Sequence, residues 1–508
     1  MQKKKNKKKP EILTLLPRLL ALYMAAVAAI IVPLYIKKEG YLRLIGTKAR
    51  IFLVFTLPAV AAAVILIIVS VLKDHLTRGK EMVPQPLHAA RLSLTEKRFS
   101  TALLIAVAGW SLFSTLLSEA PLSSFLGKIG WSVGSLMITT LIFCTIWYSH
   151  YFDFSQRLLL PLIVENTVIF IFALLQSADR DPFGFLHLIR KVYRYSYLGT
   201  IGQKNCFSGY LCLLLPLFWC MFAEAEDLRH TLLYGAFCTI GFMAIIAANS
   251  DSTFAGIGVS VFFLLPYFLF HKTRIRRASI LISLFGACLL LFRILPFFEG
   301  KVIHIMRHSH DVSAVLLRIP CSVGLILLGG LLYVFIDKWV GKDYEKRARL
   351  LLIVFEALFS VAVIVVVLRS ATGFNDKWGT NRGYIWRVGW EHFVSFPLKE
   401  KLVGVGPDLL APVYVELRLL LKTNVVAAHS EPLQVLLTQG IIGLSLYLVF
   451  WGYLVYLFVR KQLWKTEEGK FFFPLATYLG QSLFCSVYPV TAVLFSLMAG
   501  LYLREAES

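Results

Sequence analysis

Hydrophobic residues form long uninterrupted runs along this chain, and short polar stretches separate them. Each run holds roughly 17 to 25 residues, the length that an α-helix needs to cross the hydrocarbon core of a bilayer. Lipid offers no partner to an unpaired backbone group, so such runs form helices. The pattern predicts an all-α polytopic membrane protein with about 14 transmembrane helices, of which the last two are short enough to form a re-entrant pair or a tight hairpin. The runs lie near residues 12–36, 51–72, 99–117, 131–148, 157–176, 205–223, 231–248, 253–270, 278–296, 319–336, 349–368, 436–458, 471–487 and 489–504.

One polar stretch, residues 369–435, is much longer than the other connections. Apolar side chains recur at helical spacing from residue 382 to 396, so we expect an amphipathic helix on the membrane surface or on the bundle. Its apolar face would hold Ile385, Trp386, Trp390 and Phe393, with Arg382 and Arg387 on the wetter side. A second amphipathic run covers residues 409–422. We expect three parts: transmembrane helices in 1–368, a large extracytoplasmic loop in 369–435, and C-terminal transmembrane helices in 436–508.

The composition agrees with a membrane protein. Hydrophobic residues make up 57% of the 508 positions, charged residues make up 16%, and the mean hydropathy is +0.70. A soluble protein of this length could not cover so much apolar surface. The formal net charge is +22, but the basic residues lie largely between apolar runs, where they orient helices against anionic lipid. We therefore expect membrane lipid as a partner and no nucleic acid.

Charge along the chain also sets the expected orientation. The lysine-rich residues 1–10 resemble the start of a signal peptide, but run 12–36 is long enough to span and lacks a convincing cleavage site, so we expect a retained helix. With both termini in the cytoplasm, most of the loops expected inside are basic, as the positive-inside rule requires. The large loop then lies outside the cytoplasmic (inner) membrane. The basic stretch 37–50 is an exception, because it falls outside.

His429 directly precedes a membrane run, which places it at the mouth of the bundle. Imidazole titrates near physiological pH and can take a proton from a hydroxyl group, although a histidine at a helix end often serves only as a cap. His304, His308 and His310 are crowded, but no cluster of Cys, Asp or Glu completes a metal site. The cysteines lie in or beside apolar runs and match small core residues. We expect no metal and no cofactor.

Cationic side chains near glycine-rich backbone indicate where a phosphate group would bind. Arg382 can hold a diphosphate through paired hydrogen bonds, or it is an interfacial anchor. The segment Gly199-Thr200-Ile201-Gly202-Gln203-Lys204-Asn205 opens a membrane helix, whose N-terminus favours anions. Residues 249–253 form another polar patch on the same side, or only a turn, and Asp179-Arg180-Asp181 we interpret as a loop. The basic residues around the glycine segment are Arg190, Lys191, Arg194 and Lys204.

Together these segments resemble the O-antigen ligase and O-antigen polymerase superfamily of bacterial membrane glycosyltransferases, over residues 95–447. Each matching piece is short, and their order around one large external loop makes the combination specific. The pieces are Ser118-Glu119-Ala120-Pro121 followed by Gly127, the 199–205 segment, Arg382 with Trp386, Gly404-Val405-Gly406, and His429-Ser430-Glu431-Pro432-Leu433-Gln434 ending in Gly440-Ile441-Ile442-Gly443-Leu444.

The resemblance implies transfer of a polyprenyl-diphosphate-linked oligosaccharide, as on undecaprenyl diphosphate, to a hydroxyl of a glycan acceptor outside the cytoplasmic membrane and without metal. It implies that His429 activates or orients the acceptor hydroxyl. Arginines, Arg382 among them, would neutralise the departing diphosphate, a task that metal ions perform in other transferases. The substrate-binding residues expected on this basis are Lys204, Asn205, Arg194, Trp386 and Glu431.

The motifs do not separate a ligase, which transfers onto the lipid A core, from a polymerase, which joins lipid-linked repeat units. The chain has Ser430 where the family usually has Asn, and it lacks the arginine that members often carry in the turn aligned with residues 249–253. Lys204 or Arg194 would substitute for that arginine. The divergence at the turn favours a polymerase or a related surface-polysaccharide enzyme.

Two other classes stay open. A lipid-linked oligosaccharide flippase or other transporter would line a central cavity with charged residues and carry inverted repeats, whereas this chain concentrates its polar residues on one side. An oligosaccharyltransferase acting on protein would carry an acidic residue in its first external loop, where this chain has only Glu39.

Overall fold

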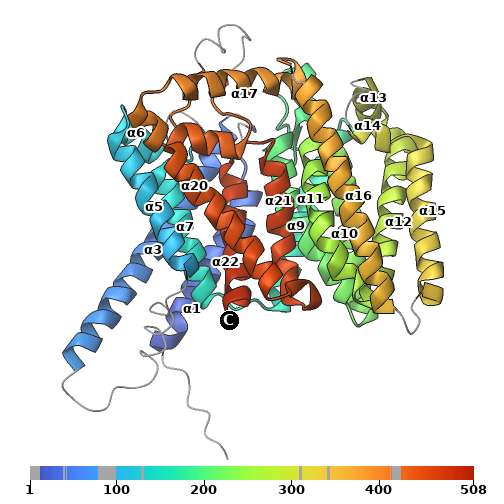
Figure 1. The fold of residues 1–508 in the computed structure, drawn as a ribbon, viewed down its shortest axis with the longest axis horizontal. Helices are drawn as coiled ribbons and strands as arrows, with labels where there is room; N and C mark the ends of the chain where they lie inside the picture. The colour runs from blue at the N-terminus through green and yellow to red at the C-terminus, as the bar shows by residue number, and fades with distance from the viewer. Residues whose placement is uncertain are drawn as a thin grey trace, which may run out of the picture.

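The computed structural model describes residues 12–37, 40–41, 43–77, 99–127, 131–307, 312–339, 344–373, 375–411, 413–414 and 425–508. This part of the chain folds into a bundle of helices, which confirms the predicted all-α polytopic fold (Figure 1). A short hairpin pairs β1 (Tyr197–Leu198) with β2 (Gly202–Gln203) in antiparallel register.

The helices are, in chain order, α1 (Ile12–Ala26), the π-helical turn η1 (Val27–Ile31), α2 (Val32–Leu34), α3 (Leu44–Thr77), α5 (Phe99–Leu117), α6 (Pro121–Leu126), α7 (Ser135–Tyr151), η2 (Gln156–Leu158), α8 (Leu159–Ser177), η3 (Lys191–Ser196), α9 (Lys204–Glu224), α10 (Leu228–Ala248), α11 (Asp251–Leu269), α12 (Lys272–Ile294), η4 (Pro296–Phe298), α13 (Glu299–Arg307), α14 (Val312–Leu316), α15 (Ile319–Trp339), α16 (Tyr344–Gly373), α17 (Trp378–Ser395), α18 (Leu398–Val403), α20 (Glu431–Arg460), η5 (Leu463–Lys465), η6 (Glu468–Phe471), α21 (Phe472–Ser482) and α22 (Pro489–Glu507).

Among the described residues, 10 helices are long and apolar enough to cross a membrane. They coincide with predicted runs. The remaining predicted runs fall on α7, α16, α21 and α22, and α21 has only 11 residues, so it ends well before residue 487. The predicted total of spans therefore stays a prediction.

The basic stretch predicted as an external loop at residues 37–50 is shorter than expected. Helix α3 begins at Leu44, not near residue 51, so Lys48 is helical and its side chain is buried. Its ammonium group donates to the carbonyl oxygens of Val32 at 2.5 Å and Pro33 at 2.8 Å. These carbonyls close the preceding helix, and a cation there satisfies acceptors that the helix end leaves open.

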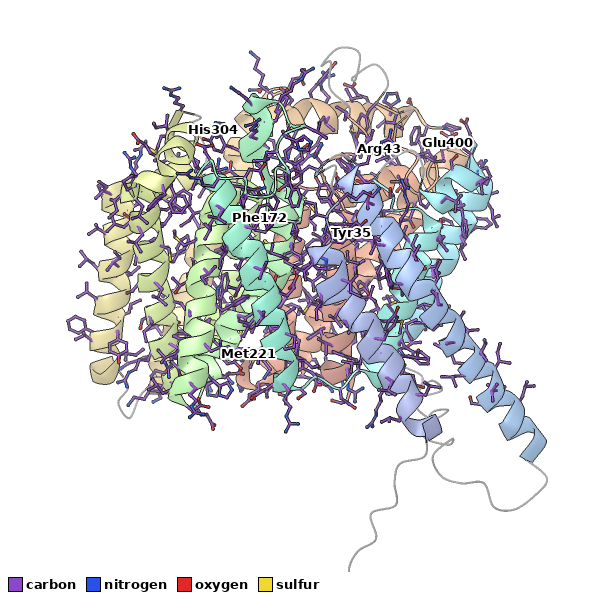
Figure 2. The ribbon with its side chains drawn as sticks, turned by 180° about the vertical axis from the view of Figure 1, so that it is seen from behind. Tyr35, Arg43, Phe172, Met221, His304 and Glu400 are labelled. Carbon is purple, nitrogen blue, oxygen red and sulfur yellow. The ribbon has the colours of Figure 1, made fainter. Side chains whose placement is uncertain are left out.

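Segments predicted on opposite sides of the membrane lie at opposite ends of the bundle. Helix α17 runs across one end, and the C-terminus lies at the other (Figure 1). Figure 2 places Arg43, His304 and Glu400 toward the α17 end and Met221 toward the opposite end. The structure thus agrees with the predicted alternation of loops between the two sides of the membrane. Which of these sides faces the cytoplasm stays a prediction.

Helix α9 forms the centre of the bundle and is buried along its whole apolar length. Close approach around it depends on small residues, as is usual between membrane helices. A Cβ atom added to Gly256 on α11 would lie 2.4 Å from the carbonyl oxygen of Thr477 on α21, and one added to Gly500 on α22 would lie 2.5 Å from the Tyr148 Cβ on α7. These close contacts hold together the helices that surround α9, whose first residues belong to the site described below.

Helix α20 is broken near its start. Gly440 has φ 68° and ψ −171°, so the predicted run 436–458 is not one continuous helix. An added Cβ there would lie 2.2 Å from the Leu402 carbonyl oxygen, so α18 approaches the break directly. The Trp110 indole donates to the Gln439 carbonyl at 2.9 Å, which satisfies a group that the break would otherwise leave open.

The large predicted loop is partly helical, as expected. Helix α17 covers residues 378–395, and Ile385 and Phe393 are buried on its inner face. Trp390 does not share that face, because 55% of it is exposed. The described residues between 409 and 414 form no helix, and the rest of the predicted amphipathic run at 409–422 lies outside the described residues.

Candidate active site

A polar pocket of about 230 Å³ lies at the α17 end of the bundle. It collects side chains that are far apart in the sequence, from the starts of α9, α11 and α17 and from the residue before the cap of α20. Among the predicted site residues, His429, Arg382, Lys204 and Asn205 line it. The remaining lining residues are Gln203, Asn249, Ser250, Asp251, Gly379 and Ile385.

Several helix N-termini face this region, which makes it suited to an anion. Helix α9 starts at Lys204 and is capped by Gln203, whose side-chain oxygen accepts from the Asn205 amide at 2.8 Å and the Cys206 amide at 3.3 Å. Helix α11 starts at Asp251 on the same pocket wall. The side-chain cap at Gln203 fixes the lysine and asparagine that follow it against the pocket.

His429 reaches the pocket through an unusual backbone conformation. It has φ +51°, in the left-handed region, and the next residue, Ser430, caps α20. Its backbone N–H donates to the Ser486 hydroxyl at 3.1 Å, which holds the turn against the α21–α22 connection. Burial, and then the positive charge of Arg382, lower the pKa of His429 from 6.5 to about 4. The imidazole is therefore neutral near pH 7 and able to accept a proton.

Arg382 lies in the first turns of α17, half-buried and facing the pocket. Its guanidinium donates to the Gly379 carbonyl at 3.3 Å, and in the described part of the chain it forms no ion pair. Arg387, expected on the same wet side, is exposed and pairs with Asp376 at 2.9 Å and Glu391 at 2.8 Å. The two arginines of α17 thus differ, since only Arg382 presents its charge to the pocket.

The opposite wall comes from the turn at residues 249–253, for which the sequence left open whether it is more than a turn. Asn249 has φ +46° and ends α10, and its carbonyl accepts from the Lys204 ammonium at 3.1 Å. The Ser250 hydroxyl donates to the Asn205 side chain at 3.0 Å. These contacts join the starts of α9 and α11 into one wall, so the turn helps to form the pocket.

The other predicted site residues lie outside the pocket lining. Arg194 donates to the Ile189 carbonyl at 3.4 Å within its own loop. The Trp386 indole donates to the Ala428 carbonyl at 3.0 Å and stacks on Phe484, so it supports the backbone just before His429. Glu431 is the first residue of α20 and is not among the residues that line the pocket; one of its carboxylate oxygens is buried and has no hydrogen-bond partner among the described residues.

The glycine motif of the large loop has a structural explanation. The amides of Val405 and Gly406 donate to the carbonyls of Leu437 at 3.0 Å and Thr438 at 2.9 Å, next to the break in α20. A Cβ on Gly406 would lie 2.6 Å from the Ser118 Cβ. The segments around Ser118 and Gly404 therefore hold the loop on the bundle instead of lining the pocket.

Other polar candidates form no comparable site. Among the described residues, no group of at least 3 His, Cys, Asp and Glu side chains is placed to hold a metal ion. His308 and His310 lie outside the described residues. Asp181 accepts from the backbone amides of Phe185 at 3.1 Å and Leu186 at 2.7 Å, in agreement with a loop at residues 179–181.

The fold and the pocket define a multi-pass α-helical membrane protein with a cation-bearing pocket at one end of its bundle. Residues 236–448 match the family model described as O-antigen ligase. This match confirms the resemblance to the O-antigen ligase and polymerase superfamily and supports a function of that type. It includes Arg382, His429 and the turn at residues 249–253, while Lys204 and Asn205 precede it. No curated protein matches the chain.

Proposed function

We propose that the protein is a surface-polysaccharide polymerase or ligase of the cytoplasmic membrane. It transfers an oligosaccharide from a polyprenyl diphosphate to a glycan hydroxyl on the outer side of the membrane, with both of its own termini in the cytoplasm. The observation that carries the proposal is the pocket, which joins His429, Arg382 and Lys204 at the end of the bundle opposite the C-terminus. The match to the O-antigen ligase family supports the reaction class.

The pocket residues suit both halves of a glycosyl transfer. The acceptor oxygen forms a bond to the anomeric carbon, and the bond between that carbon and the diphosphate oxygen breaks. Neutral His429 takes the proton of the acceptor hydroxyl as the new bond forms. The diphosphate leaves with the bonding electron pair, and Arg382 and Lys204 stabilise its growing negative charge. His429 and Arg382 are therefore the proposed catalytic residues.

Two of the remaining predicted residues, Asn205 and Trp386, receive supporting roles in this proposal. Asn205, on the pocket wall, binds the donor. Trp386 holds the backbone before His429, through Ala428. We favour a polymerase over a ligase, because the turn at residues 249–253 lacks the arginine that family members often carry there. Lys204, which donates to the Asn249 carbonyl in this turn, would substitute for it.

A reconstituted system distinguishes this enzyme from a flippase. Purified protein in liposomes is given a fluorescent lipid-linked repeat unit on its outer face, and the products are separated by length. Joined repeats are expected with the wild type and not with His429→Gln. A ligase would form no joined repeats, but would transfer the unit to added lipid A core. Movement of the unjoined lipid across the bilayer, equal in wild type and variant, would contradict the proposal and favour the transporter.

A further inference from the structure

The segment between α2 and α3 packs against the β1–β2 hairpin, which leads into the pocket. Tyr41 lies in this segment, and only 6% of it is exposed. Its hydroxyl donates to the carbonyl oxygen of Gly199, in the turn between the two strands, at 2.5 Å and to the side-chain oxygen of Gln176 on α8 at 2.9 Å. The same Gln176 oxygen accepts from the Gly199 amide at 2.8 Å. Tyr41 and Gln176 together therefore bind both polar backbone groups of Gly199.

A second hydrogen bond joins the same turn to the end of α2. The Thr200 hydroxyl donates to the Pro33 carbonyl at 2.6 Å. That carbonyl also accepts from the Lys48 ammonium group, so α3 holds it in place. Thr200 is buried, and its hydroxyl would lose a partner without gaining water if the turn moved away. The turn at residues 199–201 is thus held by α2 as well as by Tyr41.

Side-chain packing leaves little space between the segment and the hairpin. The Tyr41 ring lies 5.1 Å from the ring of Tyr197 on β1. Gly202, on β2, has φ +104°, and a Cβ added there would lie 3.0 Å from the Leu44 Cδ2 atom and 3.6 Å from the Tyr41 Cδ1 atom. Glycine at this position therefore allows both the backbone conformation and the close approach of α3.

The hairpin connects this packing directly to the pocket. Strand β2 ends at Gln203, and α9 begins at the next residue, Lys204. Gln203 pairs with Tyr197 across the hairpin, and its side chain caps α9. Both Gln203 and Lys204 line the pocket. Because no residue separates the strand from the helix, the position of the hairpin determines where the Lys204 side chain starts.

We propose that Tyr41 is a positioning residue of the anion pocket, which acts through the turn at residues 199–201 to hold Lys204 where a diphosphate group binds. The inference rests on the proposed function, since it requires that the pocket hold the donor's diphosphate. Tyr41 does not line the pocket, so it acts only through the hairpin. Tyr41 also precedes the region that matches the family model. The pocket therefore depends on the N-terminal part of the chain as well as on the matched region.

Calorimetric titration of the detergent-solubilised full chain with geranyl diphosphate tests this role. Tyr41→Phe keeps the ring that packs on Tyr197 and removes only the hydroxyl. It is expected to weaken binding about 2- to 10-fold, the range that one hydrogen bond contributes. Tyr502→Phe is the matched control, because the Tyr502 hydroxyl is also buried and donates to a backbone carbonyl, that of Leu454, at 2.8 Å. Tyr502→Phe should bind as the wild type does, and thermal unfolding compares the stability of the two variants.

A double-mutant cycle with Lys204→Met separates positioning from a general loss of packing. If Tyr41 acts through Lys204, then Tyr41→Phe should weaken binding much less in the Lys204→Met protein than in the wild type. Thr200→Val and Thr200→Ser test the turn by a second route. Thr200→Val loses the hydrogen bond to Pro33 and should bind more weakly, whereas Thr200→Ser keeps the hydroxyl and should retain the affinity.

The outcomes distinguish this inference from the proposed function. Weaker binding in Tyr41→Phe that largely disappears in the Lys204→Met protein, with normal binding in Tyr502→Phe, supports the role of Tyr41. Equal weakening in both backgrounds, equal weakening in Tyr502→Phe, or unchanged binding in Tyr41→Phe overturns the inference and leaves the diphosphate pocket intact. If Lys204→Met binds no ligand, the Thr200 pair decides, and equal weakening in both of its variants overturns the inference. If geranyl diphosphate binds neither the wild type nor Tyr502→Phe, both the pocket's proposed ligand and the role of Tyr41 are wrong.

Discussion

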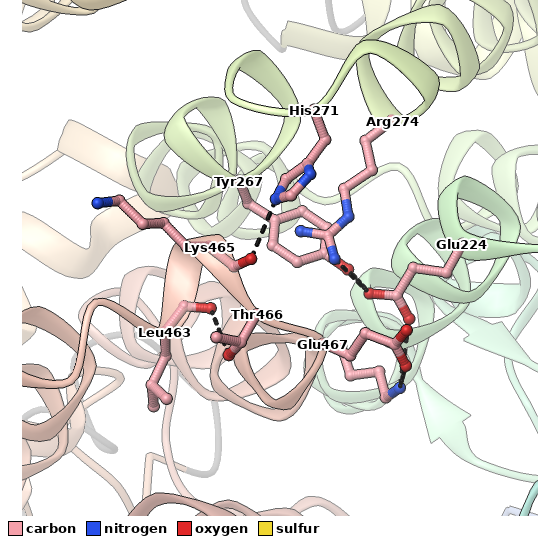
Figure 3. A network of polar contacts seen from close by, with 9 residues as sticks. Glu224, Tyr267, His271, Arg274, Leu463, Lys465, Thr466 and Glu467 are labelled. Carbon is pink, nitrogen blue, oxygen red and sulfur yellow. Dashed lines mark hydrogen bonds and ion pairs between the residues drawn. The ribbon is translucent and has the colours of Figure 1, made fainter. Parts of the chain in front are cut away.

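A histidine and an arginine lie together at each end of the bundle, but their surroundings differ. At the end that holds the C-terminus, Arg274 pairs with Glu224 at 3.3 Å, and the His271 ring lies 3.0 Å from the Lys465 carbonyl oxygen (Figure 3). Glu224 also pairs with Lys470 at 3.2 Å. One buried carboxylate therefore pairs with both cations of this network.

At the α17 end the same pair of residue types borders a pocket. Arg382 donates to a neutral carbonyl group, that of Gly379, and faces the space that it shares with His429. In both pairs burial is the first cause that lowers the pKa of the histidine, and the arginine adds to it. Composition alone therefore does not make a site. What distinguishes the α17 end is a cavity whose arginine forms no ion pair in the described structure, although the carboxylate of Asp251 also lines that cavity.

The largest expected effect comes from removing the two histidines in turn. His429→Gln removes the proposed proton acceptor and is expected to lower kcat about 10²- to 10⁴-fold, the usual contribution of a general base. His271→Gln is the matched control, and its transfer rate should equal that of the wild type. Transfer of labelled repeat units by purified protein in liposomes measures both. A folded His429→Gln protein with the wild-type rate would remove His429 from the chemistry.

Replacing Arg382 should mainly affect activity, whereas replacing Arg274 should mainly affect stability. Arg382→Gln is expected to lower kcat/KM for the lipid-linked donor about 10- to 100-fold, the effect of losing a charged hydrogen bond to the diphosphate, with little change in thermal unfolding. Arg274→Gln leaves the buried Glu224 with fewer partners and is expected to lower the free energy of unfolding by about 2 kcal/mol. Activity of the folded fraction should then stay normal. The comparison fails if Arg382→Gln is the less stable of the two and Arg274→Gln the less active.

Much of the fold could be predicted from the sequence, because the bilayer constrains it strongly. Long apolar runs must be helical. The basic residues between them predicted which loops lie on the same side of the membrane, and these loops lie at the same end of the bundle. The break at Gly440 could not be predicted, since it depends on the approach of α18 rather than on local propensity. The early start of α3 was missed because Lys48 looks like a loop residue until the carbonyls of α2 are in place to receive it.

Some residues of the candidate site could likewise be predicted from the sequence, and others could not. Residues next to helix starts, such as Lys204 and His429, were found because their position relative to apolar runs is visible in the sequence. Glu431 lies two residues after His429 in the sequence but is not among the residues that line the pocket, and the sequence alone does not show how the start of α20 is oriented.

The smallest expected effect is a shift in the pH dependence of transfer. Because the pKa of His429 is lowered from 6.5 to about 4, its neutral form persists well below neutrality, and kcat/KM should stay flat from about pH 7 to pH 5 before it falls. Unfolding restores the higher pKa, so the protein also loses stability as the pH falls from 6.5 toward 4.

Arg382→Gln removes one of the two causes of the lowered His429 pKa and should move the acid limb of the pH profile to higher pH. The limb should move by less than the full difference between the two pKa values, because burial remains the larger cause. Arg382→Lys keeps the positive charge and should leave the limb in place. A limb that is unmoved in Arg382→Gln, or that moves to lower pH, would show that Arg382 does not act on the group that accepts the proton.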